Sequence, residues 1–69
     1  MDVVYSDHAQ KRLKQRGITH LEAEHVLKHP QFIKKSLAGK KIAVGLLRNR
    51  TITVVFIETE NYIKIITIL

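Results

Sequence analysis

Polar and apolar positions in the first part of the chain are spaced as in an amphipathic helix. Within "SDHAQKRLKQRG", the apolar residues are Ala9 and Leu13, four positions apart, so they share one face of a helix. Ser6 is a favourable N-cap, and Gly17 stands where a helix commonly ends in a left-handed residue. The pattern predicts a first helix over residues 7–16.

A second helical segment follows after a short "GI" connection. Thr19 and Glu22 have the T-x-x-E spacing of a capping box. Pro30 follows a basic last turn and marks the end of this helix. Because the connection is short, we expect the two helices to form a hairpin or a sharp corner.

The second half of the chain has the composition and the breaks of short strands. It is rich in Ile, Val, Thr and Phe, and four strands are predicted at 31–38, 41–48, 51–58 and 62–68. Because the connections are short, neighbouring strands can pair only as antiparallel hairpins. The predicted fold is therefore α+β: one domain over 1–69, with two N-terminal helices on one face of a four-stranded antiparallel sheet.

The segment "TITVVFI" is apolar on both of its faces. Ile52, Val54 and Phe56 alternate with Val55 and Ile57, a pattern typical of a central strand that is covered on both sides. Two helices cover only one face, so we expect an apolar patch on the other, which a partner or a second copy of the chain hides. We expect this patch to include some of Ala43, Leu47, Ile63 and Ile65. The alternative is a monomer with an apolar, twisted sheet.

Composition narrows the class of protein without fixing its function. The chain has 69 residues, four histidines and no cysteine, which argues against a zinc ribbon or finger and favours the cytoplasm. The sequence shows neither a membrane-spanning apolar run nor a signal pattern. Twelve Lys and Arg against six Asp and Glu give a formal charge of +6, which favours a polyanion or an acidic protein as partner.

One row of residues on the first predicted helix has the composition of an RNA-cleaving site. His8, Arg12 and Arg16 recur every four residues, so they form one stripe beside the apolar face. Metal-independent RNA cleavage needs proton transfer and cations that neutralise charge on phosphorus, which His and Arg can supply. The structural alternative is that Arg16 interacts with the helix dipole, that Arg12 pairs with Glu22 or Glu58, and that His8 forms a local hydrogen bond.

Further basic residues lie in the predicted strands and turns. A meander places Lys40 and Lys41 at the same end of the sheet as Glu58, where opposite charges pair. Arg48 and Arg50 lie at the other end without an acidic neighbour in sequence, and we expect them to bind phosphate. Lys64 interrupts the last apolar strand; an RNA contact and an ordinary surface lysine both fit it.

Metal binding and base stacking receive little support. Glu22, His25 and His29 share one helical face at ligand-compatible spacing, but H-E-x-x-H is absent and a solvated polar face is the better interpretation. Leu21 points away from the apolar side of this helix, so we expect it to be exposed. The few aromatic residues form no obvious pair on adjacent strands, which favours contacts with phosphates over stacking on bases.

Two segments of the chain resemble a known group of small domains. "SDHAQKRLKQRGITHLEAEHVLKHP" resembles the H-A-x-x-R-x-x-x-R-G-I opening of a family of small uncharacterised domains, and "TITVVFIETENYIKIITIL" resembles its closing hairpin. Such domains are similar to the BrnT- and RelE-type toxins of bacterial toxin–antitoxin systems. The resemblance covers nearly the whole chain and implies a helix–helix–sheet order. It also implies RNA cleavage without a metal or other cofactor, and an acidic antitoxin as partner.

The resemblance also implies roles for individual residues. The opening histidine and arginines of the family match His8, Arg12 and Arg16, and a near-terminal threonine matches Thr67. Many relatives then carry an aromatic residue where this chain ends "IL", so any role of that residue is vacant here.

Two functions follow as hypotheses. The first is a toxin-type endoribonuclease with His8, Arg12, Arg16 and Thr67 at its catalytic site, and with Arg48, Arg50 and Lys64 on the flanking RNA backbone. The second is a non-catalytic module that binds an acidic protein or RNA. A DNA-binding helical hairpin is disfavoured, because the first half of the second helix is acidic.

Overall fold

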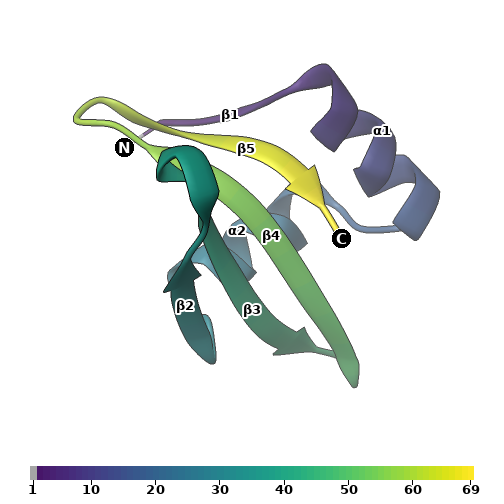
Figure 1. Cartoon of the computed structure of the whole chain (residues 1–69). Coiled ribbons are helices and arrows are strands. Elements are labelled where there is room, and N and C mark those ends of the chain that lie inside the picture. Colours follow the sequence, from purple (N-terminus) through teal and green to yellow (C-terminus); the bar gives the residue numbers. More distant parts are fainter. Residues whose placement is uncertain (1) are drawn as a thin grey trace.

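The computed structural model describes residues 2–69, which form two helices and five strands around one hydrophobic core. The elements are β1 (Asp2–Tyr5), α1 (Asp7–Arg16), α2 (His20–Lys28), β2 (Phe32–Lys35), the short 3-10 turn η1 (Leu37–Gly39), β3 (Lys41–Leu47), β4 (Arg50–Glu58) and β5 (Tyr62–Ile68). Figure 1 shows α2 behind the sheet and η1 in front of it. The predicted domain was 1–69, and its first residue lies outside the described range.

The helices begin and end at the residues that the sequence indicates. The Ser6 hydroxyl accepts a hydrogen bond from the Ala9 backbone N–H at 3.0 Å, and α1 ends at Gly17 with φ 64°. Thr19 and Glu22 form a reciprocal capping box at the start of α2. These contacts satisfy backbone groups that a helix terminus otherwise leaves without partners. The predicted helix 7–16 and the predicted start of the second helix are confirmed.

The sheet has one more strand than the sequence pattern indicates. Its order is β1-β5-β4-β3-β2, with β1 parallel to β5 and the other pairs antiparallel. The predicted central position of β4 is confirmed, but the four-stranded antiparallel sheet is wrong because the sheet is five-stranded and mixed. β1 has only four residues and pairs with the opposite end of the chain, so local connection lengths give no information about it.

The second strand is also shorter than predicted. It ends at Lys35, because the chain turns through η1, where Ala38 and Gly39 have positive φ angles of 59° and 74°. A strand cannot continue through left-handed residues. The other three predicted strands match β3, β4 and β5 to within one residue at each end.

The core lies between the sheet and both helices. Ala9 and Leu13 of α1 and Ala23 and Val26 of α2 are buried there. The sheet contributes Ala43, Ile52, Val54, Phe56, Ile65 and Ile68 to the same cluster. A Cβ atom at Gly45 would lie 3.0 Å from Val26 Cγ1, so glycine allows α2 to pack closely on β3. Neither helix of the described residues is long and apolar enough to cross a membrane.

The four residues that we expected to extend the apolar patch lie instead on the core face of the sheet. Ala43 and Ile65 are 0% exposed in the core, and Leu47 and Ile63 pack against it. Ala43 pairs with Val54, so both side chains point to the helices. A register shift of one residue in a strand reverses its face, and a β-bulge at Val55/Phe56 further lets both Ile65 and Ile68 reach the core.

The sheet nevertheless has an apolar face opposite the helices, here called the open face. It carries Val4, Phe32, Ile42, Val44, Leu46, Val55, Ile57 and Tyr62, with Lys34 and Lys64 among them. Phe32 and Leu46 are 51% and 52% exposed. Val55 and Ile57 thus lie on the side opposite the core, as their alternation with Val54 indicates.

Candidate functional site

The start of α1 is fixed against β5, and this fixes the position of His8. The Ser6 backbone N–H donates to the Ile65 carbonyl at 3.0 Å, and the Ser6 hydroxyl donates to the Ile66 carbonyl at 2.7 Å. The same hydroxyl accepts the Ala9 N–H. One serine therefore ties the first turn of α1 to the sheet, and the exposed His8 follows in that turn.

His8 and Arg12 are in contact on α1, and we call them the His8–Arg12 pair. Arg12 Nε donates a hydrogen bond of 3.4 Å to His8 Nε2. This is long for a nitrogen donor, so the bond is weak. A neutral imidazole nitrogen that carries no proton can accept such a bond. The pair is accessible to solvent, since His8 is exposed and Arg12 is half-buried.

Arg16 lies one helical turn further along α1 and is exposed. Its backbone carbonyl accepts a hydrogen bond of 2.8 Å from Arg50 Nη2. This bond brings the Arg50 guanidinium, at the start of β4, to the C-terminal end of α1. The alternative pairing of Arg12 with Glu22 or Glu58 is wrong, because those carboxylates bind Arg48 and Lys41 instead.

Arg48 and Arg50 belong to the tight turn between β3 and β4. Arg48 and Asn49 have φ angles of 53° and 65°, the left-handed geometry of a two-residue hairpin turn. The turn places Arg48 Nη1 3.6 Å from Glu22 Oε2. Arg48 has no acidic neighbour in sequence, as predicted, but in the folded protein it pairs with Glu22, which is far away in sequence.

Glu22 is held as a carboxylate at this place. The Thr19 backbone N–H donates to Glu22 Oε1 at 2.9 Å and is the largest cause of a lowered Glu22 pKa. The positive charges of Arg48 and Arg50 lower the pKa of Glu22 further.

A cleft of about 400 Å³ lies between the α1–α2 connection and the β3–β4 turn. It is lined by Gly17, Thr19, Leu21, Glu22, Leu47, Arg48, Arg50 and Ile52. Sequence reasoning did not predict this cleft. The signals available were the basic turn and Leu21, a leucine that points away from the apolar side of its helix.

Thr67 is half-buried on β5, where it pairs with Val55. Its hydroxyl makes a 3.5 Å hydrogen bond to the Ile68 carbonyl. The preceding residue, Ile66, holds Ser6 through its carbonyl, so Thr67 is one residue from the contact that positions α1. Within residues 2–69, no hydrogen bond joins the Thr67 hydroxyl to His8 or Arg12.

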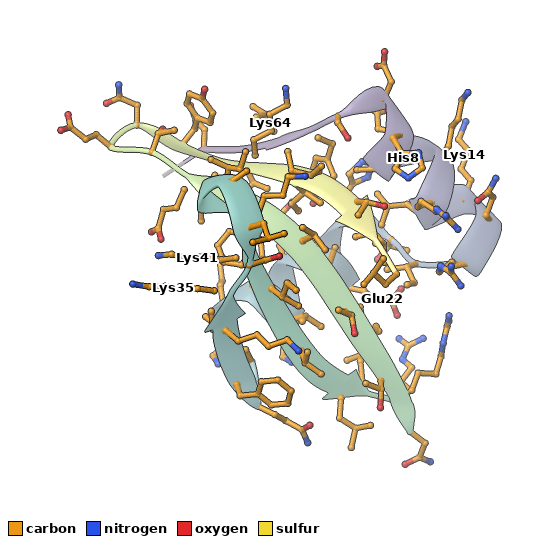
Figure 2. All side chains as sticks on the ribbon, viewed as in Figure 1. His8, Lys14, Glu22, Lys35, Lys41 and Lys64 are labelled. Atoms are coloured by element: carbon orange, nitrogen blue, oxygen red, sulfur yellow. The ribbon has the colours of Figure 1, made fainter. Side chains whose placement is uncertain are left out.

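Lys64 lies at a separate place. It pairs with Val4 and Ile57 on the open face, and it lines a shallow hollow of about 450 Å³ with Tyr62. Figure 2 shows His8 on α1 and Lys64 apart from it, where β1 and β5 lie side by side. Arg50 therefore lies at the end of the helix that carries the row, whereas Lys64 lies outside this group.

Two further contacts of ionisable side chains are structural. Lys41 Nζ lies 3.1 Å from Glu58 Oε1, which confirms the predicted pairing at that end of the sheet. The Tyr5 hydroxyl donates to Glu24 Oε2 at 2.8 Å, and burial and this carboxylate raise the pKa of Tyr5. This neutral donor ties β1 to α2, a contact that sequence reasoning missed.

The histidines of α2 and its end form no metal centre in the described part of the chain. The rings of His25 and His29 lie 5.0 Å apart between centroids. No group of three or more potential ligands comes together among residues 2–69.

Comparison with known proteins gives one match. The family described as "Domain of unknown function (DUF4258)" matches residues 5–69. No curated protein and no solved structure matches the chain.

Proposed function

The chain belongs to the DUF4258 family of domains of unknown function, and we propose that it is a toxin-type endoribonuclease that cleaves RNA in the cytoplasm without a metal or other cofactor. The observation that carries this proposal is the His8–Arg12 pair, in which the His8 imidazole Nε2 lies 3.4 Å from the Arg12 guanidinium Nε. An acceptor for a proton and a cation for phosphate are the two groups that this reaction needs.

In the proposed reaction the 2′-hydroxyl oxygen attacks the adjacent phosphorus. Its proton passes to His8 Nε2, and the bond between phosphorus and the 5′-oxygen breaks. The leaving 5′-oxygen takes a proton from water, and the resulting hydroxide takes the proton from His8. The products are a 2′,3′-cyclic phosphate end and a 5′-hydroxyl end, with no net gain or loss of atoms.

The arginines would hold the RNA backbone during this reaction. Because its hydrogen bond to His8 is long, Arg12 can turn to the scissile phosphate and free Nε2. Arg16 and Arg50 continue the basic row, since Arg50 binds the Arg16 carbonyl. Guanidinium groups suit this role because their planar donors bind two phosphate oxygens at once.

Three further residues complete the proposal. Arg48 extends the basic row to the end of the β3–β4 turn, where it would bind flanking backbone. Thr67 would orient a phosphate near the start of α1, and Lys64 would bind RNA that passes over the open face. An acidic antitoxin is the proposed partner that keeps the enzyme inactive.

The test is cleavage of an end-labelled single-stranded RNA in the presence of EDTA. We expect wild type to cut the RNA and His8→Ala to cut it at least about 100-fold more slowly, since general acid–base groups contribute that much or more. Arg12→Ala should also lose most activity. Lys14→Ala is the matched control, because Lys14 is an exposed cation on another side of α1, in the hollow that Gln10 also lines. Equal rates for wild type and His8→Ala would refute the role of His8.

A second function is favoured by the open face. Phe32 and Leu46 expose about half of their surface there, and Lys34 and Lys64 lie among the apolar residues. A non-catalytic module could use this face to bind an acidic protein, and a second copy of the chain could cover it as a homodimer. Wild-type protein that is folded yet cuts no RNA, and that loses a partner or its dimeric state on Leu46→Lys, would support this function.

A further inference from the structure

The cleft between the α1–α2 connection and the β3–β4 turn combines an apolar wall with two guanidinium groups. Leu21, Leu47 and Ile52 form the apolar part, and Arg48 and Arg50 lie beside them. Its volume of about 400 Å³ is in the range of small-ligand sites. A site for a bare anion needs no apolar wall, so the wall is the feature to explain.

Leu21 is the most exposed part of this wall. It is 80% exposed on the first turn of α2, whereas Ala23 and Val26 of the same helix are buried in the core. A single exposed leucine is common in proteins. Leu21, however, lines the same cleft as the buried Ile52, so a flat ligand bound there would cover the exposed leucine.

Arg48 lines the cleft, and its contact with Glu22 leaves most of its guanidinium accessible to a ligand. Its side chain is 82% exposed, and its distance of 3.6 Å to Glu22 is long for an ion pair. Such solvated pairs contribute little, so an anion can compete for this guanidinium. The φ of 53° at Arg48 is uncommon for a residue other than glycine. The tight turn fixes this backbone conformation and with it the direction in which the Arg48 side chain starts.

Arg50 offers a second group for the same anion. Its Nη2 donates to the Arg16 carbonyl at 2.8 Å, and this orients the guanidinium at the cleft. A guanidinium has five N–H donors, so most of them remain for a phosphate. Glu22 lines the same cleft with its carboxylate bound to the Thr19 N–H. Its negative charge repels a phosphate and offsets part of the attraction of the two arginines.

We propose that this cleft binds one nucleotide unit of single-stranded RNA, with the phosphate on Arg48 and Arg50 and the base against Leu21 and the apolar wall. The inference rests on the proposed function in that RNA is the ligand. It adds a subsite that holds a nucleotide through its base as well as its phosphate, beyond the row on α1 that contacts the reacting phosphate.

The first test is an NMR titration of the full chain with cytidine 5′-monophosphate and, separately, with inorganic phosphate. We expect the nucleotide to shift the methyl signals of Leu21, Leu47 and Ile52. We also expect it to bind at least about fivefold more tightly than phosphate, since contact of the base with the aliphatic wall removes apolar surface from water. Equal affinities for both probes, or shifts confined to the arginines, would overturn the nucleotide site.

The second test compares two exposed leucines, one in the cleft and one outside it. Leu21→Ser should lower the nucleotide's affinity to that of phosphate, while Leu37→Ser should leave it unchanged. Leu37 is 86% exposed on η1, outside the cleft. Arg48→Asn should weaken both probes, since asparagine fits the left-handed turn but carries no charge. Equal effects of the two serine variants would overturn the role of the wall.

RNA cleavage by the same proteins separates this inference from the proposed function. Nucleotide binding that depends on Leu21, in a protein that cuts no RNA, would support the subsite and contradict the nuclease. Cleavage that depends on His8, in a protein whose Leu21 signal ignores the nucleotide, would overturn the subsite and leave the nuclease standing.

Discussion

Replacement of Ser6 by alanine tests whether one side chain holds the candidate site to the sheet. The Ser6 hydroxyl accepts the Ala9 N–H at 3.0 Å and donates to the Ile66 carbonyl at 2.7 Å. Loss of the N-cap costs about 1 kcal/mol, and loss of the second, part-buried hydrogen bond costs about 1 kcal/mol more. We therefore expect Ser6→Ala to lower the free energy of unfolding by about 2 kcal/mol.

This is a large share of the stability of so small a domain. At roughly 0.05–0.15 kcal/mol per residue, a chain of 69 residues has a free energy of unfolding of roughly 3–10 kcal/mol. Urea unfolding followed by circular dichroism measures the change, and the midpoint should fall by about 1 M or more at a slope of about 1–2 kcal/mol per M.

Ser36→Ala is the matched control for Ser6→Ala. Ser36 is exposed, and its side chain makes no capping hydrogen bond at η1. Its replacement should change the free energy of unfolding by less than about 0.5 kcal/mol. If Ser6→Ala and Ser36→Ala had equal unfolding midpoints, the conclusion that Ser6 ties α1 to β5 would be refuted.

Three further expectations concern stability. Arg48→Asn should raise the free energy of unfolding by about 0.5 kcal/mol in urea, because asparagine tolerates the positive φ better; a loss would contradict strain at this turn. Gly45→Ala should lower it by about 1–3 kcal/mol, because the added Cβ would lie 3.0 Å from Val26 Cγ1, and an unchanged midpoint would show that α2 can move away. The Thr19 N–H and the two arginines hold the folded-state pKa of Glu22 below the ordinary value of a glutamate. Its contribution to stability is therefore present above that ordinary value and is lost as the pH falls through the lowered pKa. The stability difference between wild type and Glu22→Gln should therefore shrink in acid, and a difference that is constant with pH would contradict this cause.

Local signals in the sequence were sufficient for the helices. Ser6, Gly17 and the Thr19–Glu22 capping box each act on backbone groups within a few residues, so their meaning does not depend on the rest of the fold. The central place of β4 was equally readable, because apolar residues on both faces are typical of strands with a neighbour on each side. The helices cover only one of these faces, and the other belongs to the open face.

Non-local features were out of reach of the same reasoning. β1 pairs in parallel with β5 at the other end of the chain, and four residues carry too little pattern to show it. The face of each strand depends on register, and a bulge at Val55/Phe56 changes it within one strand pair. The apolar patch was therefore expected at Ala43 and Ile65, which lie in the core instead.

The candidate site divides in the same way. Helical spacing was enough to place His8 beside Arg12, and the two side chains are in contact. The link between Arg50 and the Arg16 carbonyl and the pairing of Arg48 with Glu22 join segments about 25–35 residues apart. No spacing rule along the chain reveals contacts of this kind, and the cleft that they border was missed for the same reason.

The chemistry of the cut ends tests the proposed reaction most directly. Wild type and His8→Ala are incubated in EDTA with an RNA in which the nucleotide before one cleavage position lacks its 2′-hydroxyl. If the 2′-oxygen is the nucleophile and His8 its base, wild type leaves 2′,3′-cyclic phosphate and 5′-hydroxyl ends, spares the modified position, and loses this activity in His8→Ala. Products with 5′-phosphate ends, cleavage at the modified position, or undiminished cleavage by His8→Ala would contradict the proposed function.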